Sequence, residues 1–262
     1  MNIDFHTHGK LAKGFPFDEK YPIWMFEECK NTALDAICLT EHFNTTSFEE
    51  FYNFVYENSE KDGDCLIFNG LKIFPGMEVD ILERAHILVL GKFADIMEIN
   101  RKLEKNKEKT TFLNFDNLMN LLDDYDVMIG AAHPFRSNGA IPKLSKEQLV
   151  NFDFIDLNGK DTALQGEKNI EIIKEFASSI SKPILAGSDT HQALQYASVY
   201  NQFENDINTF SALKEEIKNN RYQIIISDTI EEKIKSATLL KKALKKINAL
   251  GGDYLEILMA SK

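Results

Sequence analysis

The sequence contains few cysteines and no apolar run long enough to cross a membrane. Its three cysteines, Cys29, Cys38 and Cys65, are an odd number without a C-x-x-C spacing. Such a set indicates reduced thiols in a cytoplasm rather than a disulfide framework. No apolar run reaches the roughly 18 residues of a membrane span. The N-terminus also lacks the pattern of a signal peptide. We therefore expect a cytoplasmic protein.

Basic charge is also scarce. Lysine and arginine number 30 against 41 aspartates and glutamates, which gives a formal net charge of −11. A surface of this sign disfavours diffuse attraction to nucleic acid or to anionic membranes. Divalent cations would reverse the sign locally, so an anionic substrate could still bind. We predict a small phosphorylated substrate as partner, with no long nucleic acid and no membrane. The oligomeric state is left open.

Several sequence motifs are missing as well. The chain has no G-x-x-x-x-G-K-[ST], G-x-G-x-x-G or G-x-S-x-G motif. This argues against a P-loop NTPase, a dinucleotide-dependent dehydrogenase and a serine hydrolase. No glycine- or serine-rich linker and no internal repeat divides the chain. We predict one domain over residues 1–262, with a helical tail at 230–262.

Short apolar runs alternate with amphipathic stretches along the chain. The runs are short and uniformly apolar, which is typical of buried parallel strands. The predicted strands are Asn2–Phe5, Ala36–Thr40, Leu71–Phe74, His86–Leu90, Val127–Ala131, Phe154–Leu157 and Pro183–Ala186. The predicted helices between them are Phe48–Glu57, Phe115–Tyr125, Lys146–Asn151 and Asn169–Ser178.

This alternation predicts an α/β fold with a parallel sheet and crossover helices. The charged segment Lys102–Lys109 indicates a solvated helix end or a loop. In the tail, Ile230–Ile247 repeats apolar residues at helical spacing among many lysines. We interpret it as a surface helix that packs on the barrel, in preference to a membrane-surface helix.

Polar residues that bind metals follow the ends of these strands. Because the C-terminal ends of parallel strands meet on one face of an α/β barrel, these residues are expected to converge there. All six histidines of the chain fall at the edges of predicted strands. Six histidines with unrelated structural roles would not be expected to share this placement. The candidates are His6, His8, His42, Glu78, His86, His133, Asp189 and His191.

The spacing of these candidates suits cation binding. Residues i and i+2 of a strand point the same way, so His6 and His8 could hold one cation together. Asp189 and His191 have the same spacing, and the two oxygens of Glu78 could bridge two cations. Mixed imidazole and carboxylate ligands suit Zn²⁺, Mn²⁺ or Fe²⁺. We predict two or three divalent cations per chain.

Six motifs, in this order, carry a family resemblance: DFHTH, LTEH, PGMEVD, AHILVLG, AAHP and GSDTH. Over about residues 1–225 the chain resembles the polymerase and histidinol phosphatase (PHP) family. The resemblance implies a single distorted (β/α)7 barrel with a cluster of two or three metals at the C-terminal ends of the strands. It also implies a metal-dependent phosphoesterase.

The resemblance assigns roles to the candidate ligands. His6, His8, Glu78 and Asp189 would hold one metal, and Glu78 would bridge to a second metal that His133 helps to bind. His42 and His191 would belong to a third metal. His86 matches a ligand of the nucleotide-phosphatase-like branch, although a histidine that begins a strand could equally face the barrel wall.

Lys13 departs from the family pattern. The resemblance implies an aspartate or histidine ligand of the third metal at this position, and an ammonium group offers donors only. The third metal would then be absent, or Asp18 would supply the ligand, or Lys13 would supply positive charge in its place. Lys13 as a solvated loop residue is the remaining alternative. We predict a third site that is weakened or altered.

Two further positions are candidates for substrate contact. Arg136 follows the His133-Pro134 motif, and its guanidinium could hold a phosphate through two hydrogen bonds. A surface arginine is the alternative. Residues 158–160 (Asn-Gly-Lys) follow a strand at the same face and indicate either substrate contact or a loop turn.

Together these features predict a metal-dependent hydrolase that cleaves a small phosphomonoester, such as a nucleotide, a sugar phosphate or a histidinol phosphate-like compound. The predicted catalytic residues are Asp189 and His191 for proton transfer and Arg136 for neutralising phosphoryl charge. The alternatives are a hydrolase of a non-phosphate ester or amide, a non-catalytic metal-binding module, and a nuclease acting on oligonucleotides.

Overall fold

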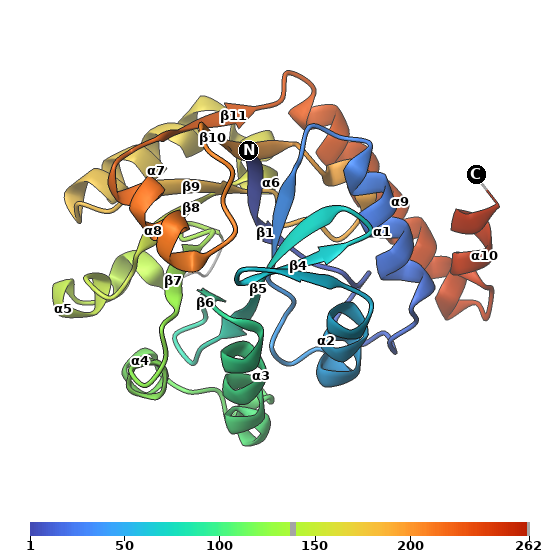
Figure 1. Cartoon of the computed structure of the whole chain (residues 1–262), viewed down its shortest axis with the longest axis horizontal. Coiled ribbons are helices and arrows are strands. Elements are labelled where there is room, and N and C mark those ends of the chain that lie inside the picture. Colours follow the sequence, from blue (N-terminus) through green and yellow to red (C-terminus); the bar gives the residue numbers. More distant parts are fainter. Residues whose placement is uncertain (137–139, 261–262) are drawn as a thin grey trace.

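A computed structural model describes residues 1–136 and 140–260 of the chain. These residues form one twisted sheet surrounded by helices (Figure 1). The strands are β1 (Asn2–Thr7), β2 (Ala36–Leu39), β3 (Glu60–Asp62), β4 (Cys65–Phe68), β5 (Leu71–Asp80), β6 (His86–Leu90), β7 (Met128–Ala132), β8 (Phe154–Asn158), β9 (Ile184–Gly187), β10 (Val199–Phe203) and β11 (Tyr222–Ile226).

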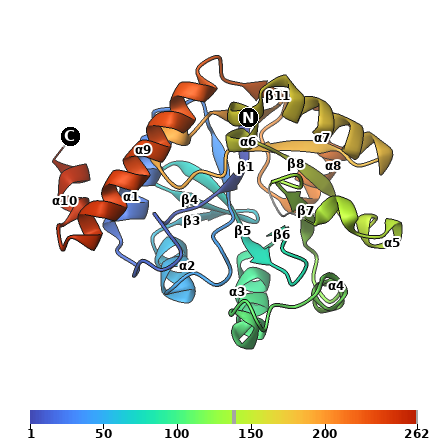
Figure 2. The ribbon, with the colours of Figure 1, turned by 180° about the vertical axis from the view of Figure 1, so that it is seen from behind.

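The α-helices of the described residues are α1 (Lys20–Lys30), α2 (Phe48–Glu57), α3 (Phe93–Lys102), α4 (Phe115–Leu122), α5 (Lys146–Leu149), α6 (Gly159–Gln165), α7 (Glu167–Ser179), α8 (Phe210–Lys218), α9 (Ile230–Ala249) and α10 (Tyr254–Met259). Short 3-10 turns are η1 (Glu104–Asn106), η2 (Ile141–Lys143) and η3 (Ala193–Gln195). Seen from behind, α9 runs along one side of the barrel and leads to the C-terminus (Figure 2).

The sheet curls into a nearly closed barrel. Its strand order is β11-β10-β1-β2-β5-β6-β7-β8-β9, with the β3–β4 hairpin added beside β5. The residues after β9 return to the end of β1, where Asp189 N–H donates to the His6 carbonyl at 2.7 Å and His8 N–H donates to the Thr190 carbonyl at 2.8 Å. The predicted α/β barrel is therefore confirmed.

The prediction of parallel strands is wrong for β6. This strand pairs antiparallel with both β5 and β7. A parallel pair needs a crossover connection of about a dozen residues or more. The segment between β5 and β6 covers only residues 81–85, so the chain can only turn back.

Alternate residues of the strands pack in two apolar layers. On β2, Ile37 and Leu39 belong to the larger cluster, which includes residues of the surrounding helices. Ala36 and Cys38 belong to the smaller cluster, which α8 also joins. Buried on both faces, such strands read as continuous apolar runs, which is why the sequence located them.

Candidate metal centre

The predicted site residues meet at one edge of the barrel. Most follow the C-terminal end of a strand. His86 instead begins β6 and reaches the same edge because β6 is antiparallel, in register with Asp80 of β5 and Ala132 of β7. Linked contacts join eight predicted residues: His6, His8, His42, Glu78, His86, His133, Asp189 and His191.

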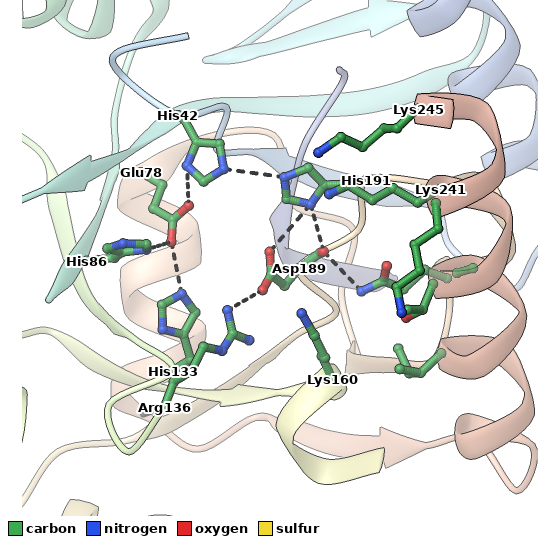
Figure 3. A pocket seen from close by; sticks show the side chains of 15 residues that line it. His42, Glu78, His86, His133, Arg136, Lys160, Asp189, His191, Lys241 and Lys245 are labelled. Atoms are coloured by element: carbon green, nitrogen blue, oxygen red, sulfur yellow. Dashed lines mark hydrogen bonds and ion pairs between the residues drawn. The ribbon is translucent and has the colours of Figure 1, made fainter. Parts of the chain in front are cut away.

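Glu78 lies at the centre of this cluster (Figure 3). Its oxygens lie 2.6 Å from His86 Nδ1, 2.7 Å from His42 Nδ1 and 3.0 Å from His133 Nε2. Burial opposes ionisation of Glu78, but the charge of His86 and neighbouring histidines holds its pKa well below the ordinary value. An ionised carboxylate with both oxygens directed at imidazoles suits the predicted bridging role.

Asp189 forms the opposite wall. Its Oδ1 lies 3.3 Å from His8 Nε2 and 3.8 Å from His6 Nε2, and its Oδ2 accepts a hydrogen bond from Arg136 at 2.7 Å. Both histidine nitrogens are also 3.6 Å from Glu78. The i, i+2 histidines therefore face two carboxylates at once. The backbone of Asp189 is left-handed, with φ of 59°, a strained conformation of the kind that clusters at functional sites.

A third group contains imidazoles alone. His42 Nε2 and His191 Nε2 lie 3.3 Å apart, and the ring of His8 lies within 4.3 Å of both rings. Burial lowers the pKa of His42 to about 4 and the pKa of His191 well below its ordinary value. Both rings are therefore neutral near pH 7, which is the form that binds a cation.

The donor atoms fit divalent cations. Three groups bring ligand atoms within 4.8 Å of one another: His6–His8–Asp189, His6–Glu78–His133 and His8–His42–His191. Within the described residues, His6 Nε2, His8 Nε2 and Glu78 Oε2 are buried without a hydrogen bond. Buried polar atoms of native proteins nearly always have a partner, and a cation between these atoms would supply one.

His86 belongs to none of these groups among the described residues. Both its ring nitrogens contact carboxylates, Nδ1 that of Glu78 and Nε2 that of Asp80 at 3.1 Å. Burial disfavours its charged form, but these carboxylates raise the pKa of His86 to about 10. In this arrangement His86 is a protonated partner of Glu78, and its role as a ligand stays a prediction.

Lys13 is part of the same network. Its Nζ lies 2.6 Å from Asp80 Oδ2. This ion pair places positive charge beside the cluster, and the role of Lys13 at the third site stays a prediction. Asp18 is engaged elsewhere, because its Oδ1 accepts the backbone N–H of Lys20 at 2.9 Å near the start of α1.

The guanidinium of Arg136 is hydrogen-bonded to other protein groups. It donates to Asp161 at 3.1 Å, to Asp189 and to Asn158 Oδ1 at 2.8 Å. Asn158 also caps α6. Of the three residues predicted after this strand, Asn158 is the buried last residue of β8, Gly159 is the buried first residue of α6, and Lys160 lines the pocket.

Two carboxylates that orient ligands were not predicted. Asp156 Oδ2 contacts His6 Nδ1 at 3.1 Å and accepts the backbone N–H of His133 at 3.0 Å. Glu41 accepts the backbone N–H groups of Gly9 and His42. A carboxylate inside or directly after an otherwise apolar strand is the sequence signal that could have identified both.

A pocket of about 370 Å³ opens over the cluster. Glu78, Asp189 and their histidine neighbours line its inner wall. The outer wall comes from α9, which the sequence indicated only as a surface helix (Figure 3). The residues of this helix that line the pocket are Ile234, Ala237, Thr238, Lys241, Lys242 and Lys245.

Comparison with solved structures shows related folds. PsfC from Pseudomonas syringae PB-5123 superposes with a TM-score of 0.75 at 18% identity, over 93% of this chain and 98% of that chain. The lesion-specific endonuclease PfuEndoQ from Pyrococcus furiosus gives a TM-score of 0.62 at 20% identity, over 85% of this chain and 57% of that one. A search of curated protein sequences finds no match.

The expectation that long nucleic acid is excluded as a partner is wrong. An endonuclease Q complex with a 27-mer duplex, which has an abasic lesion at the active site, shares the fold at a TM-score of 0.61 and 18% identity, over 83% of this chain and 56% of that one. The net charge does not by itself exclude nucleic acid as a partner, because it averages over the whole surface. At the pocket mouth Lys160, Lys241 and Lys245 place positive charge next to the cluster.

Two family models match the sequence. The PHP domain model matches residues 21–160, and the PHP-associated model matches residues 170–222. No helix of the described residues is long and apolar enough to cross a membrane. The first match covers more than half of the chain and includes four of the predicted ligands. The chain therefore belongs to the PHP domain family and is, as the sequence predicts, a metal-dependent hydrolase.

Proposed function

We propose that this chain is a phosphoesterase that hydrolyses a small phosphomonoester in the pocket over the metal centre. The observation that carries the proposal is the pairing of two features in one pocket. The floor is a set of imidazoles and carboxylates suited to divalent cations, and the mouth carries Arg136 and Lys160. Phosphate esters are inert, and their hydrolysis requires large stabilisation of negative charge.

The cations would be held by the eight predicted ligands, with Glu78 shared between two of them and the identity of the metal left to experiment. Bound divalent cations supply Lewis-acid activation of water and charge opposite the phosphoryl oxygens. Asp189 and His191 lie on the pocket wall, where either could move a proton to the leaving oxygen. Arg136 would turn from Asp161 toward an equatorial oxygen.

A second candidate is cleavage of a phosphodiester in nucleic acid. It is favoured by the fold shared with endonuclease Q and by the lysines at the mouth of the pocket. The two candidates use the same cluster and differ in what must fit above it. A small phosphomonoester needs only the pocket itself, whereas a duplex needs an approach across α9.

The test is hydrolysis by protein reconstituted with Mn²⁺, Zn²⁺ or Fe²⁺. The substrates are p-nitrophenyl phosphate, a panel of metabolite phosphomonoesters, an abasic-site duplex and p-nitrophenyl acetate. We expect phosphate release from the monoesters, and Asp189→Ala should lower kcat by about 10²-fold or more. Arg136→Ala should mainly raise KM, whereas the exposed control Asp124→Ala should match wild type.

Cleavage of the duplex without phosphate release from any monoester would favour the second candidate. Cleavage of the acetate ester alone would replace both candidates with a non-phosphate esterase. Metal retention without any hydrolysis would favour a metal-binding module.

A further inference from the structure

The outer wall of the pocket carries lysines from a helix that neither family model matches. The helix α9 begins at Ile230, eight residues beyond the last matched position, 222. Its apolar residues Ile234, Ala237 and Leu244 are buried, and the helix packs on η3 and α6. Lys241 and Lys245 are one helical turn apart, so they lie on the same face, and both line the pocket with Lys160 of α6.

The ammonium groups of these lysines form no ion pair with any residue that the structure describes. In residues 1–136 and 140–260, no hydrogen bond or ion pair joins the ammonium group of Lys160, Lys241 or Lys245 to another residue. Arg136 in the same pocket is bound by two carboxylates and an amide oxygen. The pocket is therefore lined by one paired guanidinium, that of Arg136, and by four lysines, Lys242 included, that have no ion pair among the described residues.

Lys241 is the most enclosed of the three. Burial, together with the charges of Lys160 and Lys245, lowers the pKa of Lys241 to about 8. Asp189 and Glu41 act in the opposite direction but do not compensate. Holding like charges together on the wall of a pocket is costly unless an anion joins them. With cations on Asp189, the need for an anion there is greater.

We propose that Lys241 and Lys245, with Lys160, bind a second anionic group of the substrate, a phosphate or carboxylate carried on the alcohol side of the phosphoester. Figure 3 shows these lysines across the pocket from Glu78 and His86, with Asp189 between. The scissile phosphate would lie at the cluster and the second anion under α9. This inference rests on the proposed function. It narrows the substrate to a small molecule that carries a second anionic group apart from the scissile phosphate.

The test compares two non-hydrolysable ligands, propylphosphonate and propane-1,3-diphosphonate, which differ in the second phosphonate. Their affinities for the Mn²⁺-loaded full chain are measured by calorimetry. We expect wild type to bind the diphosphonate at least tenfold more tightly, a difference of about 1.4 kcal/mol. In Lys241→Gln/Lys245→Gln the ratio should fall to about threefold or less.

Two matched variants separate charge from folding. Lys246→Gln removes one exposed charge of the same helix outside the pocket lining, so it should keep the wild-type ratio. Lys241→Arg/Lys245→Arg keeps the charge and should keep most of the ratio. If the glutamine pair fails to fold, Lys245→Gln alone, at an exposed position, provides the comparison.

Equal affinities for the two ligands in wild type would overturn the inference. So would a ratio unchanged by the glutamine substitutions. Displacement of the diphosphonate by an abasic duplex at lower concentration, lost in the glutamine pair, would assign the lysines to nucleic acid instead. Hydrolysis of p-nitrophenyl phosphate measured beside these ratios distinguishes failure of the proposed function from failure of this subsite.

Discussion

Glu78 is the residue on which the candidate centre depends most. It contacts three imidazoles at 3.0 Å or less and lies 3.6 Å from His6 and His8. We expect Glu78→Ala to lower metal occupancy at two sites at once, because one carboxylate serves both. Elemental analysis of the purified variant measures this, with Glu60→Ala on the exposed β3 strand as control. Loss of a single metal equivalent would contradict the bridging role.

His86 makes metal binding sensitive to pH. In the metal-free chain the carboxylates of Glu78 and Asp80 raise the pKa of His86 to about 10 against the effect of burial. A cation on Glu78 would repel that proton. Metal binding should therefore release protons, and cation affinity should rise as the pH increases from about 6 toward 10.

Calorimetric titration of Mn²⁺ in two buffers of different ionisation enthalpy counts the released protons. His86→Gln should release about one proton fewer than wild type. Identical heats in both buffers would show that His86 is already neutral before the metal binds.

Lys13 is expected to weaken the third site. The group of His8, His42 and His191 contains no carboxylate, and Lys13 adds positive charge through its pair with Asp80. Dialysis against a weak chelator should leave two firmly held metals per chain and remove any third. Lys13→Met should slow the loss of the third metal, while Asp18→Asn should not affect it. Three metals resistant to dialysis would contradict this prediction.

At the scale of elements, the contact of β9 with β1 positions the centre. A Cβ at Gly187 would lie 2.3 Å from His6 Cβ and 3.0 Å from the His6 backbone nitrogen. Gly187→Ala must therefore push the two strands apart, at a cost of about 1–3 kcal/mol in unfolding free energy. Because His6 moves, metal occupancy should fall as well.

Urea unfolding and elemental analysis measure both effects. Gly14→Ala is the matched control, because a Cβ there has nothing within 4 Å and the residue has no left-handed backbone. A fully metallated Gly187→Ala protein with wild-type stability would show that the β1–β9 contact does not position His6.

At the scale of the whole molecule, bound cations would offset part of the negative charge of the chain. The net charge is −11, and several buried carboxylates, among them Glu41, Glu78, Asp156 and Asp189, lie in or beside the cluster. Ligands that bind only the folded state stabilise it by about 2.7 kcal/mol at a hundredfold excess over Kd. Removal of metals by a chelator should then lower Tm by about 5–10 °C.

Thermal scans with and without EDTA measure this shift, and added Mn²⁺ or Zn²⁺ should restore the original Tm. Glu78→Ala should show a much smaller response to EDTA, because less metal is bound to it at the start. An unchanged Tm in wild type would mean that the cluster forms without cations.

The sequence by itself predicted the barrel, which the structure confirms, and located the candidate ligands, whose binding of metal stays a prediction. Each ligand adjoins a short apolar run, and runs that are buried on both faces are visible without knowledge of their neighbours. The candidate ligands at or after the C-terminal ends of β1, β2, β5, β7 and β9 were therefore located, and so was His86. The single-domain organisation stays a prediction.

Only the tertiary structure decided the direction of β6, the partner of Lys13 and the place of α9. Strand direction depended on the short connection at 81–85, which the apolar pattern does not report. The pair of Lys13 with Asp80 and the approach of Lys241 to Asp189 join residues far apart in the chain. The spacing of apolar residues along the sequence indicates which face of a helix is apolar, but only tertiary packing determines which part of the molecule that face covers.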